Sequence, residues 1–299
     1  MATFESVRST PAARKARSYQ ASRRMARITL YAVVLMLAII FAFPFFYTVS
    51  SSLKGQWEVL LFPPTMLPAV PQWQNYVRVF QVTPFGTWLL NTITVVVLST
   101  TGAVISSTLV GYSLARFKYR GRDLLLMLAL ATMMLPGQVT LIPQFLLFNK
   151  LRWINTIRPL WIPAWFGGGA FNIFLMRQFM MTLPLELDEA AAIDGAGRLR
   201  TFLTILVPLC KPAIATMAVI SFMGNWSDFM SPLIYLNSQD KFTVAVGLNY
   251  FKAVPASSEE QFYHYLMAAC VISLAPCIAM FFSAQRYFVR GIAMTGLKG

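Results

Sequence analysis

The sequence predicts an all-α, polytopic membrane protein with six transmembrane helices. Of its 299 residues, 57% are hydrophobic and only 12% are charged, whereas soluble domains carry about 25% charged residues. The apolar residues also gather in runs that reach the length of about 20 residues needed to cross the hydrocarbon. The net charge of +14 would suggest nucleic acid as the partner of a soluble protein. Here the basic residues flank the apolar runs, which is typical of membrane orientation.

The first half of the chain contains three runs of this kind. The first three predicted spans are residues 28–53, 79–115 and 124–149. The first two runs contain no charged residue. The third contains Pro136 and Pro143, and a proline inside a helix removes a backbone donor and crowds the preceding turn. We therefore expect these prolines to bend or end the third span.

The second half supplies three further runs. The remaining predicted spans are residues 159–176, 212–236 and 262–285. Gly167, Gly168 and Gly169 lie in the fourth span and indicate either close packing of helices or a hinge. Asp228 lies in the fifth. A charge at the bilayer centre costs roughly 2.5–3.5 kcal/mol, while each Leu, Ile, Phe or Val returns about 0.3–0.6 kcal/mol. The apolar residues of that span therefore roughly balance the aspartate.

The distribution of basic residues predicts the orientation. Six spans place both termini on one side, and 18 of the 25 Lys and Arg residues lie in the termini and loops of that side. The positive-inside rule then places both termini in the cytoplasm. We expect a basic cytoplasmic arm (1–27), a six-span domain (28–288) and a cytoplasmic tail (289–299). The first outer loop (54–86) is rich in Pro and Trp and is expected to form an ordered cap.

Motifs of catalysis and metal binding are not found. The sequence has no P-loop pattern, no HExxH and a single histidine, and its three cysteines form no CxxC pair. We therefore predict no catalytic residue and no metal ligand, and we do not expect an enzyme. The cysteines are expected to be small buried hydrophobic residues.

One polar stretch, residues 184–208, lies between the fourth and fifth spans on the predicted cytoplasmic side. Pro184 favours a helix start, and acidic residues in the first turn are stabilised by the helix dipole. Three small alanines follow, and Gly195 and Gly197 then allow a sharp turn before a second helix over 198–207. From these properties alone, the loop is either an ordinary amphipathic connector or a surface that another protein approaches closely.

The stretch EAAAIDGAGRLRTFLTILVP resembles the EAA loop of ABC importer permeases. That pattern is E-A-A, three residues, Gly, nine residues, then I-x-L-P. The residues in register are Glu189, Ala190, Ala191, Gly195, Ile205 and Pro208. Val207 stands in place of the usual leucine. NWSDFMSPL and QRYFVRGIAMTGLKG resemble the carbohydrate branch of the same family, and the chain looks like the shorter, six-span partner of a maltose-type permease pair.

This resemblance implies a type I ABC importer permease fold in the cell inner membrane. The loop would be the coupling helix that docks in a groove of a cytoplasmic ATPase, which binds the ATP and Mg; this chain itself would hold no cofactor. The further partners implied are a second permease, a second ATPase copy and an external solute-binding protein. The residues that the resemblance assigns to ATPase coupling are Glu189, Ala190, Ala191, Asp194, Gly195, Ala196 and Arg198.

A sugar or related polyol is the solute that the resemblance implies. Polar side chains at membrane depth generally face the bundle interior or a water-filled cavity, although asparagines also bond across helices. The candidate pathway residues are Asn225, Trp226, Asp228, Asn91 and Asn172. The alternative is an ion-coupled secondary transporter acting without an ATPase. Such proteins place paired ionisable residues in the spans, and many carry inverted repeats; this chain offers Asp228 and no visible repeat.

Overall fold

A computed structural model describes residues 11–251 and 262–295. The first ten residues of the predicted arm and the last four of the predicted tail lie outside the described residues. Within these ranges every regular element is a helix, as predicted. The α-helices are α1 (Pro11–Ser52), α2 (Asn75–Val82), α3 (Phe85–Arg116), α4 (Arg122–Thr132), α5 (Gly137–Lys150), α6 (Arg158–Trp161), α7 (Ala170–Met181), α8 (Glu186–Ile193), α9 (Arg198–Thr201), α10 (Val207–Leu209), α11 (Lys211–Ser227), α12 (Met230–Tyr235), α13 (Val244–Tyr250) and α14 (Tyr263–Thr295). Short 3-10 turns cover Glu58–Leu60, Ile162–Trp165 and Gln239–Lys241, and a π-turn covers Phe202–Leu206.

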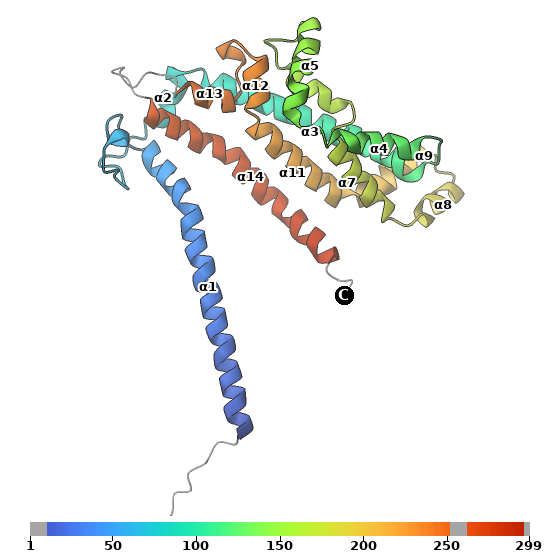
Figure 1. The fold of residues 1–299 in the computed structure, drawn as a ribbon, viewed down its shortest axis with the longest axis horizontal. Helices are drawn as coiled ribbons and strands as arrows, with labels where there is room; N and C mark the ends of the chain where they lie inside the picture. Colours follow the sequence, from blue (N-terminus) through green and yellow to red (C-terminus); the bar gives the residue numbers. More distant parts are fainter. Residues whose placement is uncertain (1–10, 252–261, 296–299) are drawn as a thin grey trace, which may run out of the picture.

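Helix α3 is the central element of the bundle (Figure 1). It packs against α7 and α11 along its length, because its uncharged residues include glycines where neighbours come close. A Cβ added to Gly102 would lie 2.4 Å from the ring of Trp165, and one on Gly111 would lie 2.8 Å from Met176 Cβ. Such distances are below normal contact, so these glycines set the separation between α3 and its neighbours.

Two buried clusters hold the bundle, one toward each end of α3. The first cluster consists of Val79, Phe85, Trp88, Val244, Phe251, Tyr265, Leu266 and Ala269. The second consists of Tyr112, Met176, Met180, Phe202, Leu206, Cys210, Ala213 and Met217. Cys210 is therefore a buried core residue, as predicted, while Cys270 and Cys277 are half-buried and form no disulfide among the described residues.

The helices that are long and apolar enough to cross a membrane agree only in part with the predicted spans. Among the described residues three qualify, Arg23–Ser52, Phe85–Arg116 and Tyr263–Ser283. Two bent helix pairs raise this to as many as five: α4 with α5, bent by 100°, and Arg198–Leu209 with α11, bent by 75°. The six-span count therefore stays a prediction.

The bends occur where the sequence places helix-breaking residues. Of the two prolines in the third predicted span, Pro136 stands at the break before α5, whereas Pro143 lies inside that helix. The fourth predicted span is divided into α6, a 3-10 turn and the 12-residue α7. Gly167, Gly168 and Gly169 have φ of 98°, 66° and 93°, which L-residues rarely adopt, so these glycines interrupt the helix.

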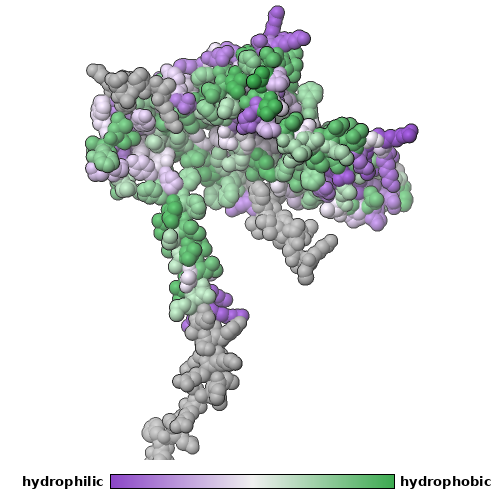
Figure 2. Space-filling model, in the orientation of Figure 1, coloured by the Kyte–Doolittle hydropathy of each residue, from purple (hydrophilic) through white to green (hydrophobic). Residues whose placement is uncertain are grey.

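Helix α1 projects away from the bundle (Figure 1). Among the described residues its main helical neighbour is α14, which it meets near its C-terminal end. Figure 2 shows a hydrophobic surface along most of the described part of α1, with hydrophilic residues near its start. The segment that follows α1 is ordered by side-chain contacts, as expected for a cap. Asn75 Nδ2 donates to the carbonyl oxygens of Ser52 and Lys54, each at 2.9 Å, and the buried Lys54 ammonium donates to the Thr65 carbonyl.

Candidate functional site

The loop between α7 and α11 folds as a helix, a turn and a second helix, as its sequence predicts. Acidic residues occupy the first turn of α8, where the helix dipole stabilises them. Gly195 has φ +76°, its N–H donates to the Ala192 carbonyl at 3.1 Å, and the Ala196 N–H donates to the Ala191 carbonyl at 2.8 Å. This pair of bonds is a Schellman motif, which ends a helix with a left-handed glycine. Gly197, in contrast, is extended with φ −67°.

The second helix begins at Arg198 and contains a π-turn over Phe202–Leu206 before Pro208. Proline has no N–H to donate to the carbonyl four residues earlier, and single π-turns occur at such interruptions. Cys210 then separates this helix from α11. The loop therefore turns back into the bundle through a bend of 75°.

The tip of the loop is exposed and combines acidic and apolar groups. Glu189, Ala190 and Asp194 are exposed, and Ile193 and Leu199 are 87% and 67% exposed. Figure 2 shows hydrophilic residues gathered at the end of the molecule where α8 and α9 lie. Large exposed apolar side chains amid polar ones mark contact surfaces. Sequence reasoning missed Ile193 and Leu199, although both stand beside the turn glycines.

The remaining predicted loop residues face their own chain. Ala191 is only 4% exposed, so it packs inward, and Ala196 is half-buried. Arg198 is exposed, but its guanidinium carbon lies 4.8 Å from the ring centroid of Phe117, a cation–π distance. Its backbone carbonyl accepts a hydrogen bond from the Tyr112 hydroxyl at 3.3 Å. Arg198 thus fastens α9 to the end of α3.

A second attachment between α3 and the loop is made by Arg116. Its Nε lies 3.2 Å from Oδ2 of Asp188, and its Nη2 donates to the Leu183 and Pro184 carbonyls at 3.1 and 3.4 Å. A hollow of about 260 Å³ remains between these groups and Glu189. In the sequence, Arg116 is one of the basic residues that orient the chain, and nothing in its local pattern indicates a partner 72 positions away.

The polar candidates of the fifth predicted span lie at two larger hollows. Asn225 and Asp228 line a hollow of about 560 Å³ between α5, α6, α11 and α12. Trp226 instead lines a hollow of about 850 Å³ bounded by α1, α13 and α14. One oxygen of Asp228, Oδ1, accepts from the Ser231 N–H at 3.2 Å. Asn225 Oδ1 accepts from the Ser99 hydroxyl at 3.0 Å.

Aromatic rings form one wall of the hollow of Asn225 and Asp228, which we call the outer hollow. Phe148 and Trp153 are stacked with centroids 5.7 Å apart, and Tyr235 meets Phe148 edge-on at 5.2 Å. The lining residues are Gln144, Leu147, Phe148, Leu151, Trp153, Pro159, Leu160, Ile162, Pro163, Phe166, Asn225, Asp228, Ser231 and Tyr235. Aromatic faces beside amide, hydroxyl and carboxylate groups suit a hydroxylated ligand. Sequence reasoning found Asn225 and Asp228 but missed the aromatic wall, whose members come from α5, the loop that follows it and α12.

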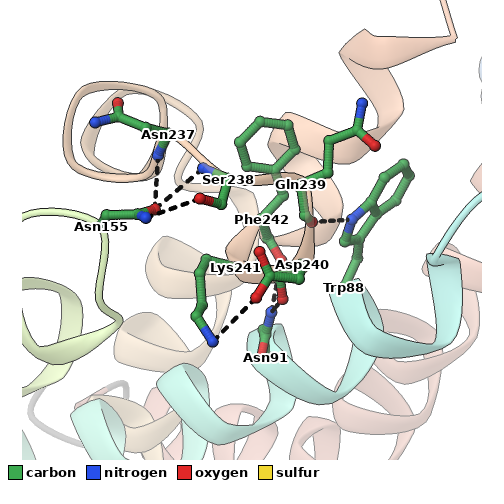
Figure 3. Close-up of polar contacts among 9 residues, drawn as sticks. All are labelled: Trp88, Asn91, Asn155, Asn237, Ser238, Gln239, Asp240, Lys241 and Phe242. Atoms are coloured by element: carbon green, nitrogen blue, oxygen red, sulfur yellow. Dashed lines mark hydrogen bonds and ion pairs between the residues drawn. The ribbon is translucent and has the colours of Figure 1, made fainter.

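Asn91 and Asn172 are absent from the lining of these three hollows. Asn91 Nδ2 donates to the carbonyls of Asp240 and Phe242 at 2.9 and 3.1 Å (Figure 3). Asn172 Nδ2 donates to the Gly168 carbonyl at 2.7 Å and to the Ser221 hydroxyl at 3.4 Å. Both amides bond between segments, which is the alternative role of such residues, and their place on a solute pathway stays a prediction.

Comparison with known proteins places the chain among importer components. Residues 107–294 match the family described as binding-protein-dependent transport system inner membrane component. The arabinooligosaccharides transport system permease protein AraQ of Halalkalibacterium halodurans is 30% identical, over 88% of this chain and 93% of that protein. The sn-glycerol-3-phosphate transport system permease protein UgpE of Yersinia enterocolitica is also 30% identical, over 91% and 97%.

The solved structures agree with the relatives. The structure of a bacterial ABC transporter involved in the import of the acidic polysaccharide alginate matches with a TM-score of 0.80 and 25% identity, over 89% of this chain and 98% of the matched chain. The matches extend over nearly the whole length of both partners, so the fold and the family are shared along the chain. This protein belongs to the binding-protein-dependent transport system inner membrane component family, and it is an ABC importer permease, a multi-pass inner-membrane translocation subunit and not an enzyme.

Proposed function

We propose that this chain forms half of the transmembrane pathway of an ATP-driven importer for a sugar or related polyol, and that it couples to a cytoplasmic ATPase through the loop 184–208. The observation that carries the proposal is the geometry of that loop. Its tip exposes Glu189, Ile193 and Leu199 around the Gly195 turn, while its base is fastened to α3 by Arg116. An exposed tip on a fixed base is the arrangement that a docking element requires.

The individual loop residues then take different roles. Glu189 and Asp194 offer charge to the ATPase, and Ala190 with Ile193 offers apolar contact. Gly195 makes the turn. Ala191, Ala196 and Arg198 keep the two helices together on their own chain.

The partners follow from this role. We propose a heterodimer with a second permease, two ATPase subunits that hold the ATP and Mg, and an external solute-binding protein. Both termini and the loop 184–208 lie in the cytoplasm in this arrangement. The outer hollow and the hollow lined by Trp226 then open toward the second permease or the outside.

The charge of the outer hollow narrows the class of solute. Among the described residues that line it, Asp228 is the one charged residue, and none is Lys or Arg. The relatives are named for arabinooligosaccharides and for sn-glycerol-3-phosphate. A carboxylate repels a phosphate or a uronate but accepts hydrogen bonds from hydroxyl groups. We therefore propose a neutral, hydroxylated solute, which stacks on the aromatic wall through its apolar face.

Exchange of Glu189 for lysine tests the coupling role. Glu189→Lys reverses the charge of an exposed side chain, so membrane insertion should continue and ATPase attachment should weaken. Asp123→Lys is a matched control, since Asp123 is an exposed acid on the same predicted side with Arg122 as its ion-pair partner. The measurement is the amount of ATPase that co-purifies with the tagged chain in mild detergent.

The result also separates the importer from a secondary transporter. Normal ATPase attachment and transport in the Glu189→Lys variant would remove the coupling role. A purified chain that carries no ATPase and still transports in vesicles without ATP would support the ion-coupled alternative.

A further inference from the structure

Helix α3 joins the coupling loop to the opposite end of the molecule. It is one uninterrupted helix of 32 residues, which corresponds to a length of about 48 Å at 1.5 Å per residue. Figure 1 shows it running from α2 and α13 at one end to α9 at the other. Both ends carry side chains that bond to the backbone of other segments.

At the loop end, a nearly buried arginine makes the connection. The Arg116 side chain is 5% exposed, and burying a cation is costly unless it is paired and hydrogen-bonded. Its partners are Asp188 of α8 and the carbonyls of Leu183 and Pro184, which lie between α7 and α8. Separating α8 from α3 would remove the one carboxylate that faces this buried charge among the described residues, which favours movement of the two helices together.

At the other end, three side chains within little more than one turn of α3 hold residues 237–244, which lead from α12 into α13 and which we call the outer segment. The Trp88 Nε1 donates to the Gln239 carbonyl at 2.7 Å, and Asn91 donates to two further carbonyls of the segment (Figure 3). Thr92 Oγ1 accepts from the Val244 N–H at 2.8 Å. A Cβ on Gly247 would lie 2.1 Å from the Trp88 ring, so the start of α13 is also packed closely against α3.

Between the two ends, α3 is packed too tightly to slide against its neighbours. Gly102 and Gly111 admit Trp165 and Met176 at distances that exclude a Cβ. Gly168 approaches the backbone of Ala103, where a Cβ would lie 2.4 Å from the carbonyl oxygen. Close-packed interiors transmit displacement instead of absorbing it.

We propose that α3 is a rod that transmits movement between the coupling loop and the outer segment, with Arg116 and Thr92 as positioning residues at its two ends. A displacement of α8 by the ATPase is passed through Arg116 to α3, and through Thr92 and Trp88 to residues 237–244. Binding at the outer face is passed in the reverse direction, since coupling between two sites is reciprocal. This inference rests on the proposed coupling function of the loop.

Variants of the two end residues test the rod in the complete transporter. The complex with the second permease and the ATPase is placed in proteoliposomes. ATP hydrolysis is measured with and without the solute-binding protein, loaded with the arabinose, xylose or glucose oligosaccharide that stimulates the wild type most. The variants are Arg116→Gln, Thr92→Val and the double variant. The controls are Arg120→Gln, an exposed arginine near Arg116, and Thr94→Val, an exposed threonine whose hydroxyl bonds only to the Leu90 carbonyl of its own helix.

The rod predicts a specific loss of communication. Thr92→Val should keep ATPase attachment and unstimulated hydrolysis, while stimulation by the loaded binding protein falls about fivefold or more. In Arg116→Gln, the stimulation per attached ATPase should fall by a similar factor. The double variant should lose no more than the worse single variant, because both changes interrupt one connection. Thr92→Ser keeps the acceptor for the Val244 N–H and should restore stimulation, whereas both controls should match the wild type.

The contrary outcomes are distinct. Full stimulation in either single variant, or losses that multiply in the double variant, would overturn the rod. Loss of ATPase attachment in Thr92→Val would also overturn it, because a change at the far end of α3 would then disturb assembly and not communication. Absence of the ATPase from the wild-type complex is a different failure, that of the proposed function itself.

Discussion

The two glycines of the coupling loop allow a matched test of the turn. Gly195 and Gly197 are two residues apart, and a Cβ added to either meets no heavy atom within 4 Å. They differ in backbone conformation, since Gly195 has φ +76° and Gly197 has φ −67°. Replacement by alanine therefore introduces strain at Gly195 and none at Gly197.

The size of the effect follows from the conformational cost alone. Holding an alanine in the left-handed region costs about 1–2 kcal/mol, and no steric clash adds to this value. If the ATPase binds only the native turn, the strain lowers the affinity of the permease for the ATPase by about 5- to 30-fold. Gly195→Asn should lose less, because asparagine tolerates this conformation better than alanine.

The assay is the binding of purified ATPase to the permease pair in detergent or nanodiscs, by titration of each variant. We expect Gly195→Ala to bind most weakly, Gly195→Asn to be intermediate, and Gly197→Ala to match the wild type. Equal affinities for Gly195→Ala and Gly197→Ala would refute the reasoning, because they would show that the left-handed turn has no part in docking.

Two further predictions concern the membrane domain. Gly168→Ala should lower the Tm of the purified complex strongly, because its Cβ would lie 2.4 Å from the Ala103 carbonyl oxygen and its φ is +66°. Gly224→Ala, with open space around the added Cβ, should leave the Tm unchanged. Similar Tm values for the two variants would show that the α6–α7 junction yields easily. Asp228→Asn should lower uptake of a neutral oligosaccharide by about tenfold, because the outer hollow loses a charged acceptor of hydrogen bonds. ATP hydrolysis without the binding protein should be retained. Unchanged uptake would place the solute elsewhere.

The fold could be predicted from the sequence as far as apolar length determines it. The uncharged run before Arg116 gives α3 directly, and the hydrophobic run after residue 262 gives α14. The division of the fourth predicted span could not be predicted in the same way. Three glycines in a row are compatible with a tightly packed helix or with a break, and the positive φ of all three in the structure decides for the break.

The helix–turn–helix form of the loop 184–208 was predictable because its determinants are local. The acidic first turn and the glycine at the helix end lie within about ten residues of one another, and each acts on its own backbone. The outer hollow was not predictable as a whole, since Trp153 and Tyr235 meet through Phe148 across more than eighty positions of the chain. A single sequence shows such residues as unrelated interfacial aromatics.

Asn91 and Arg116 show why polar residues of a span are ambiguous in sequence. Both lie on α3. From the sequence, Arg116 is explained by the orientation of the chain in the membrane, and Asn91 by contact with the solute. The structure gives both the same kind of partner, a backbone carbonyl of another segment. Such a bond satisfies a polar side chain and also ties two segments together. Since these bonds stand at opposite ends of one rigid helix, the polar residues that hold the fold are in the positions required to carry movement across it.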